Sequence, residues 1–587
     1  MGGAQMLSFL LCLGMKSAQA AQQHGAEIAR VLAQRSFMEA PLPPPSLSAH
    51  TLHHAGDEGT VLRGRRWHLL RSSLSRRGVG AEAQQQLAQV HEKLQAMSPY
   101  EAQQYLVETL QRLEESAAWV AWSERDLCAL AFRDPLGKVP LYVLRKGSSY
   151  MVSNTRLALE PWLQDAPLGS DTTLAALLVT SSPSSHRETS FQALQRVPPG
   201  SFVHLSATHA PIHHRWWHWR APVIQSIAPD DAAAEYRSLF LDSLKRAREL
   251  STVVVELSAG MDSTSILAGL RAIEPDLALH ALNYSHGPHD EERQLAEQLC
   301  VQLGVSFQAA PMKRPAERYF PDPVTGGSLT STLSFLGELP GPREVFSGHG
   351  GDNLFLVSRA DMDRMARELS PLRLAQQLRR HQKLHGRLPP LFLRERLQGM
   401  PDAHALRDRR IPWLTPAIDT LVSDLVERSF QEERPKTGRD GMAYAHRWAN
   451  TFEISDPGFH GTSTQYRFPF FDLALMRFVA SLPPAPYLYD KYVARAAMRG
   501  ALPESIRCRP KTFDAVNEPR LLFQPYSARL LEQTNLPEWL LPEPLKQLLQ
   551  TPEAFPRWIY PSARATLDLM QWQSHCASAR LHLGNNG

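Results

Sequence analysis

The strongest constraint on this fold is a run of β-branched residues that leads directly into a turn of small residues and then a helical pattern. Residues 252–258, TVVVELS, suit a parallel strand buried on both faces. The first turn, LSAGMDSTS at residues 257–265, comes next, and residues 264–273 have helical spacing. The alternation continues with a strand, a helix and a later strand, over residues 277–285, 291–304 and 344–348. This order predicts a doubly wound α/β domain.

The residues before this alternation follow a different pattern. Residues 81–117 have helical spacing, whereas residues 117–154 break into short apolar runs separated by SERD, DPLGK and RKGSS. Short runs between turn signals predict an antiparallel sheet layer. Residues 196–205 add another turn and strand.

Chain length and a polar stretch divide the protein. A chain of 587 residues is expected to form two domains or more, and residues 225–232 are polar. We therefore expect one domain over residues 1–222 and another over residues 230–587, the latter mainly helical after about residue 360.

Composition bears on the class of protein and on its partners. The net charge of +4, without a long basic run, argues neither for nor against nucleic acid. No nucleic-acid partner is expected, because no basic RNA-binding appendage is evident. Five cysteines without CxxC spacing predict reduced thiols in a cytoplasmic protein. No apolar stretch is long enough for a membrane span. Residues 6–15 loosely mimic a signal peptide but lack a basic start, so we expect a first buried strand there.

The first turn has the composition of an anion site. Ser258, Ala259 and Gly260 are small, so backbone N–H groups at the helix N-terminus can approach a ligand, above all a phosphate. Asp262 fits such a site when Mg²⁺ lies between its carboxylate and the phosphates, and Ser263 can donate a hydroxyl. The alternative is an ordinary helix capped by Asp and Ser.

A second turn, SGHGGDNLF at residues 347–355, follows another predicted strand and carries Asp352. Open α/β sheets bind their ligands at the carboxyl ends of such strands. Asp262 and Asp352 would then hold Mg²⁺ on the phosphates of ATP. The alternative for this segment is a flexible loop. Lys511, in RCRPKTFD, would by itself be a surface lysine.

Several motifs together resemble one family. The first turn looks like the SGGxDS loop of N-type ATP pyrophosphatases, and the second turn resembles the SGxGxDExF motif of asparagine synthetases and β-lactam synthetases. Further matching segments are RFPFFDLALMRFVASLPP (467–484), KYVARAAMRGALPESIRCRPKTF (491–513), RDPLGKVPLYV (133–143) and VPPGSFVHL (197–205). The chain is thus similar to the asparagine-synthetase-like family.

This resemblance implies a fold, a reaction and a set of site residues. The first half would be an Ntn-hydrolase-like, glutaminase-like αββα sandwich, and the second a doubly wound α/β synthetase domain with helical additions. A carboxylate would attack the α-phosphate of Mg-ATP, and a nitrogen nucleophile would then attack the acyl-adenylate. The implied nucleotide-binding residues are Leu257, Ser258, Ala259, Gly260, Asp262, Ser263, Ser347, Gly348 and Gly350, with Asp262 and Asp352 as metal ligands. Lys511 matches the family lysine that stabilises developing charge.

Differences between this sequence and the family motifs indicate which source of the amine to expect. Glutamine-hydrolysing members use an N-terminal cysteine, whereas Met1 is followed here by glycines, so we expect an inactive glutaminase-like half. The amine would then come from the substrate itself, as in β-lactam synthetases and lasso peptide cyclases. We favour a lasso peptide cyclase, with a precursor peptide as substrate and a leader-peptide protease and a leader-binding protein as further partners.

His349 stands between the glycines of the second turn, where relatives carry Glu or Tyr. A neutral imidazole can accept the proton lost as an amide forms, so His349 is a candidate general base. The alternative is a hydrogen-bonded loop histidine. Two further functions stay open, a small-molecule synthetase (β-lactam or asparagine) and a non-catalytic peptide-binding scaffold.

Overall fold

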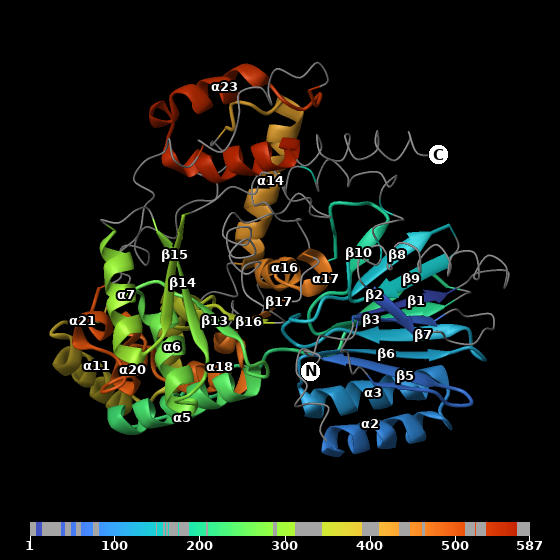
Figure 1. Cartoon of the computed structure of the whole chain (residues 1–587), viewed down its shortest axis with the longest axis horizontal. Coiled ribbons are helices and arrows are strands. Elements are labelled where there is room, and N and C mark those ends of the chain that lie inside the picture. The colour runs from blue at the N-terminus through green and yellow to red at the C-terminus, as the bar shows by residue number, and fades with distance from the viewer. Residues whose placement is uncertain are drawn as a thin grey trace.

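The structure is a computed structural model. It describes residues 8–13, 37–40, 49–54, 60–73, 81–147, 149–156, 159, 163, 174, 187–206, 209–285, 290–311, 343–389, 410–433, 446–460, 464–510, 523 and 536–571. Figure 1 shows a sheet-rich N-terminal half beside a C-terminal α/β half. Among the described residues, no helix is long and apolar enough to cross a membrane.

Two antiparallel sheets, each with six strands, lie in the described part of the N-terminal half. The first has the order β10 (Leu194–Arg196), β8 (Tyr142–Lys146), β9 (Ser149–Ser153), β1 (Ser8–Leu13), β3 (Ala49–His54) and β2 (Phe37–Ala40). The second has the order β12 (Ile212–Arg215), β11 (Ser201–Ser206), β7 (Cys128–Phe132), β6 (Ala117–Ser123), β5 (His68–Ser73) and β4 (Thr60–Leu62).

Side chains that alternate along the strands separate the layers. Val120 of β6 points into the core between the two sheets, while its neighbour Trp119 packs in the core beneath the helices α2 (Ala81–Leu94) and α3 (Pro99–Leu113). The outer face of the first sheet, with Tyr142, packs against C-terminal side chains such as Trp413. These layers form the predicted αββα sandwich, which is confirmed.

The C-terminal half is built on a parallel sheet of five strands in the described residues. Its order is β15 (Ser306–Pro311), β14 (Leu279–Ser285), β13 (Val253–Glu256), β16 (Arg343–Phe346) and β17 (Thr464–Arg467). The chain winds outward from β13 in one direction and then returns to β16 on its other side. This reversal of strand order is the topological switch point at which such sheets bind ligands. The predicted doubly wound domain is confirmed.

Helices cover both faces of this sheet (Figure 1). Val253 and Val255 pack in the core that contains α5 (Pro229–Ala247), α6 (Met261–Ile273) and α7 (Glu291–Leu303), whereas Val254 packs with Phe459 on the opposite face. The other described helices of four residues or more are α9 (Gly351–Leu354), α10 (Arg359–Glu368), α11 (Pro371–His385), α14 (Pro416–Glu433), α16 (His446–Ile454), α17 (Pro457–His460), α18 (Leu473–Ser481), α19 (Pro484–Tyr487), α20 (Tyr492–Ala497), α21 (Glu504–Arg507), α23 (Pro542–Gln550) and a helix over 560–571.

Buried ion pairs join the two halves. Glu453 of α16 accepts Arg196 at 2.5 Å and lies 3.0 Å from the Arg133 guanidinium, which is fully buried. Burial opposes the charge of Glu453, but these two arginines outweigh it and hold the pKa of the carboxyl below its usual value. The contact fixes the sandwich against the helices that pack on the parallel sheet.

Candidate active site

A cavity of about 1000 Å³ opens at the carboxyl ends of β13 and β16, where the two turns predicted from the sequence lie side by side. The first turn lines it with Ser258, Ala259, Gly260, Asp262 and Ser263, and the second with Ser347, Gly348, His349, Gly350 and Asp352. Later residues line it as well, namely Leu488, Tyr489, Asp490, Lys491, Ile506, Arg509 and Pro510. Segments far apart in the sequence therefore meet at the switch point of the sheet.

The first turn is organised by its own hydroxyl groups. The Ser263 Oγ accepts the Ser258 N–H at 3.0 Å, and the Ser258 Oγ accepts the Gly260 N–H at 3.1 Å. Gly260 caps α6 without a side-chain hydrogen bond, so the first amides of this helix lie at the cavity. The Glu292 carboxylate accepts the Ala259 N–H at 3.1 Å, which shows that the turn holds an anionic oxygen.

The second turn needs glycine for two separate reasons. Gly350 adopts φ of 91°, which an L side chain rarely tolerates. A Cβ on Gly351 would lie 2.3 Å from the Asp262 Cγ. The absence of a side chain there lets the second turn approach the carboxylate of the first.

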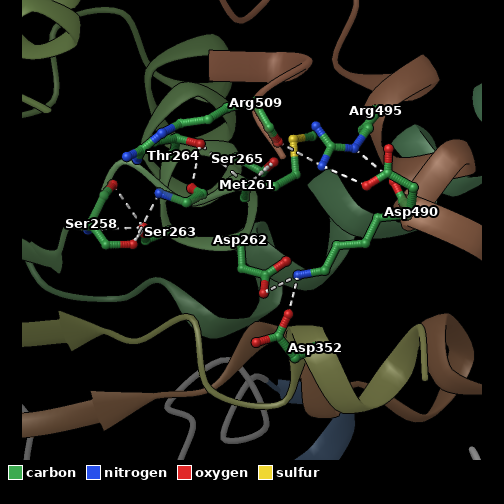
Figure 2. Close-up of polar contacts among 12 residues, drawn as sticks. Ser258, Met261, Asp262, Ser263, Thr264, Ser265, Asp352, Asp490, Arg495 and Arg509 are labelled. Carbon is green, nitrogen blue, oxygen red and sulfur yellow. Dashed lines mark hydrogen bonds and ion pairs between the residues drawn. The ribbon is translucent and has the colours of Figure 1, made fainter. Parts of the chain in front are cut away.

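Asp262 and Asp352 face each other across the cavity (Figure 2). The Lys491 Nζ lies between them, 2.6 Å from the Asp262 Oδ2 and 2.6 Å from the Asp352 Oδ1. The side chains of Asp262 and Lys491 are each 16% exposed, whereas Asp352 is 50% exposed. Two carboxylates, one from α6 and one from α9, therefore converge on one cation position.

The chemistry of these donors fits Mg²⁺ bound to a nucleotide. Mg²⁺ is usually held by one or two carboxylates together with phosphate oxygens and water. Asp262 and Asp352 supply two such carboxylates, and Gly351 leaves the room that their approach requires. Among the described residues no group of three or more His, Cys, Asp and Glu side chains could hold a metal, so an all-protein site is absent there.

Lys491 is presented by a turn in an unusual conformation. Both Asp490 and Lys491 have left-handed backbone angles, with φ of 49° and 53°. Arg495 braces this turn, because its guanidinium donates to the Asp490 carbonyl at 2.6 Å and to the Asp490 Oδ1 at 3.0 Å (Figure 2). It also donates to the carbonyls of Arg507 and Arg509, the latter at 2.9 Å. One arginine thus ties the Lys491 turn to the segment before residue 511.

His349 lies in the cavity wall. Its Nδ1 is 2.5 Å from the Ser347 Oγ, and its ring meets the edge of Phe468 with centroids 6.3 Å apart. When the Nδ1 donates to the Ser347 hydroxyl, the Nε2 carries the lone pair of a neutral imidazole. The ring is therefore held at the cavity wall by one hydrogen bond and one aromatic contact.

One of the predicted site residues, Leu257, does not join this group. Leu257 packs in the core and does not line the cavity, with its N–H bonded to the Leu282 carbonyl at 2.8 Å and its carbonyl to the Asn283 Nδ2 at 2.8 Å. Its predicted contact with the nucleotide is therefore not supported by its position. Lys511 lies outside the described residues.

The sequence reasoning missed Lys491 and Arg495, although both stand in the family-like segment 491–513. The spacing of a lysine and an arginine four residues apart indicates a helix face as readily as a site. The family-like segment 491–513 contains both residues, so the resemblance could have indicated a role for them.

Comparisons with known proteins agree with this architecture. The asparagine synthase family model matches residues 235–575, and the glutamine amidotransferase domain model matches residues 98–217. A search of curated proteins gives no match.

Several solved structures are similar to this chain, among them the three that follow. The allosteric regulatory enzyme of purine biosynthesis is 12% identical with a TM-score of 0.25, and the match covers 53% of this chain and 82% of that one. Glutamine phosphoribosylpyrophosphate amidotransferase from B. subtilis is 10% identical with a TM-score of 0.23, covering 58% and 75%. The U34-tRNA thiolase NcsA from Methanococcus maripaludis is 14% identical with a TM-score of 0.18, covering 38% and 80%.

The asparagine synthase model spans more than half of the chain, including both turns and the strands that carry them. The chain therefore belongs to the asparagine synthase family and is an ATP-dependent ligase that forms amide bonds.

Proposed function

We propose that the chain is a macrolactam-forming ligase of the lasso peptide cyclase type. It adenylates an Asp or Glu side chain of a precursor peptide, with release of pyrophosphate. The N-terminal amine of the same peptide then displaces AMP and closes the ring. The observation that carries the proposal is the convergence of Asp262 and Asp352 at one cation position in a large cavity.

The adenylation step follows from the two turns. Mg²⁺ held by Asp262 and Asp352 would neutralise charge on the phosphates of ATP. The uncapped amides at the start of α6 favour phosphate oxygens through hydrogen bonding and the helix dipole. Arg509 lines the same cavity and adds a fixed cation for the leaving pyrophosphate.

The size and lining of the cavity favour a peptide over a small amino acid. Its volume of about 1000 Å³ stands at the upper end of ligand pockets, so a nucleotide leaves room for a second substrate. Its wall includes apolar side chains from three segments, namely Leu356, Val357, Trp448, Leu488 and Tyr489. Free aspartate and ammonia would not use such a wall, whereas side chains of a peptide would.

The thiols of Cys128, Cys300 and Cys508 are poorly suited to hydrolyse glutamine. Burial raises the pKa of Cys128 and of Cys300 to about 12. The Glu504 carboxylate raises the pKa of Cys508. A thiol needs to be ionised to act as a nucleophile, so none of these three is suited to glutamine hydrolysis.

His349 is proposed as the base of the ring-closing step. The amine must lose a proton as the amide bond forms, and a neutral imidazole can take it. Its hydrogen bond with Ser347 fixes the ring at the cavity wall. Holding amine and acyl-adenylate within one folded substrate supplies the high effective concentration that ring closure needs.

The test uses synthetic linear peptides that carry one Glu or Asp and a free N-terminal amine. We expect Mg-ATP-dependent release of AMP and pyrophosphate, with loss of one water from the peptide by mass spectrometry. The same peptide with an acetylated N-terminus should be adenylated but not cyclised, and hydroxylamine should trap it as a hydroxamate. The variant Asp262→Asn should abolish both reactions.

Two outcomes would overturn the proposal. Amidation of free aspartate with ammonia, and no reaction with any peptide, would point to a small-molecule synthetase. Peptide binding without AMP release, unchanged by Asp262→Asn, would point to a non-catalytic scaffold.

A further inference from the structure

The cation position between Asp262 and Asp352 is held by a side chain of the protein itself. The Lys491 Nζ is within 2.6 Å of an oxygen of each carboxylate, so it neutralises part of their mutual repulsion. Two carboxylates that converge without a cation would repel each other, and the second turn would lose its approach to the first.

The backbone around Lys491 is built to deliver this contact. Left-handed conformations are unfavourable for residues other than glycine, and both Asp490 and Lys491 adopt one. The hydrogen bonds of Arg495 to Asp490 hold the turn in that shape. Strain that is held by specific contacts, at a binding site, indicates a functional constraint on the residue that it positions.

A metal ion and the lysine cannot share this position. Mg²⁺ binds oxygen ligands at about 2.0–2.1 Å, so an ion bound to both carboxylates would lie within a few ångströms of the present Nζ. Two cations at that separation repel strongly in a half-buried site. The lysine has a flexible four-carbon stem, so its head can leave while its backbone stays fixed.

We propose that Lys491 is an internal counter-ion that occupies the metal position in the nucleotide-free enzyme and yields it when Mg-ATP binds. The proposal rests on the proposed function only in placing the nucleotide metal at Asp262 and Asp352. Free Mg²⁺ must displace the lysine without compensation and therefore binds poorly. Mg-ATP brings phosphates that accept the displaced ammonium, so metal and nucleotide enter together.

The experiment measures Mg²⁺ binding to the full chain without nucleotide or peptide, by isothermal titration calorimetry and by thermal shift. In Lys491→Met the competing cation is absent, and the apparent affinity for Mg²⁺ should rise by about tenfold or more over the unmodified protein. Lys491→Arg keeps a cation and should show no gain. The double variant Lys491→Met with Asp352→Asn should lose the gain.

Each outcome decides the matter. A folded Lys491→Met that binds Mg²⁺ no better than the unmodified protein overturns the proposal. If that variant unfolds, Lys491→Gln is used, and recovery of folding by Mg²⁺ supports the proposal, while failure of Mg²⁺ to restore either variant overturns it. Because no peptide is present, a failed cyclisation assay alongside a gain in metal affinity would reject the ring-closing function but leave the counter-ion role intact.

Discussion

Gly351 offers a test of the site that needs no knowledge of the acceptor substrate. A Cβ at this position would lie 2.3 Å from the Asp262 Cγ and 2.5 Å from its Oδ2, whereas carbon contacts are normally about 3.5 Å or more. In Gly351→Ala the Asp262 carboxylate must therefore move by roughly 1 Å. Mg²⁺ demands near-ideal geometry, and disturbing the setting of a metal ligand commonly costs about 10- to 100-fold in affinity.

The same substitution should not damage the fold. Gly351 begins α9 and does not have a left-handed backbone. The atoms that a new Cβ would displace belong to the Asp262 carboxylate, and none of them is a backbone atom. Replacing glycine by alanine at a compatible position stabilises a protein by about 0.4–1 kcal/mol through the unfolded state. We therefore predict unchanged or slightly higher thermal stability, together with a loss of about 10- to 100-fold in Mg-dependent affinity for a non-hydrolysable ATP analogue, measured by calorimetry.

Gly304 provides the matched control. It ends α7 with φ of 61°, and a Cβ there would meet nothing within 4 Å. Gly304→Ala should lower stability by about 1 kcal/mol because of its backbone conformation, with nucleotide affinity unchanged. Normal nucleotide binding by Gly351→Ala would refute the close approach of the two turns.

The remaining predictions concern buried charged groups. Glu453→Gln leaves Arg133 and Arg196 buried without their counter-charge, and should lower the free energy of unfolding by about 3–5 kcal/mol in urea; a change below about 1 kcal/mol would contradict the buried ion pairs. Burial raises the pKa of Asp456 to about 8 from 3.8, so the native state keeps a proton that the unfolded state loses, and stability should fall as pH rises from about 4 to 8. In Asp456→Asn, the free energy of unfolding from urea titrations should no longer decline between pH 5 and pH 8. An equal decline in the variant and the unmodified protein would contradict this role of Asp456. Burial lowers the pKa of His381 to about 4, so the free energy of unfolding should fall as pH drops from about 6.5 to 4. In thermal melts at acid pH, His381→Phe should lose less stability than the unmodified protein does.

Local sequence patterns were sufficient to predict the elements that carry the two turns. The run Val253–Val255 has the composition of a buried parallel strand, and β13 lies at the centre of the sheet. Asp262 was predicted because a carboxylate is unusual in an anion site without a cation, and Asp352 because its turn follows a second predicted strand. Both predictions depend on neighbours in the chain, which a sequence shows directly.

Features that depend on distant contacts were not predictable in this way. The strand β17 pairs with β16 across more than a hundred residues of intervening chain, and its sequence TQYR has no strong strand signal. Lys491 reaches Asp262 across 229 positions, through a left-handed turn made without glycine. Such a turn is set by the bracing of Arg495, and no local rule indicates it. Leu257 stands within the first turn, yet it packs in the core and is not among the residues that line the cavity.

The most direct test of the central claim is to locate the metal. A crystal structure of the chain with Mn²⁺ and a non-hydrolysable ATP analogue, with anomalous data at the manganese edge, shows where the ion binds. The account predicts one peak bridged by the Asp262 and Asp352 carboxylates and the phosphates, with the Lys491 ammonium moved off both. A metal–nucleotide complex bound elsewhere, or one that contacts neither carboxylate, would contradict it.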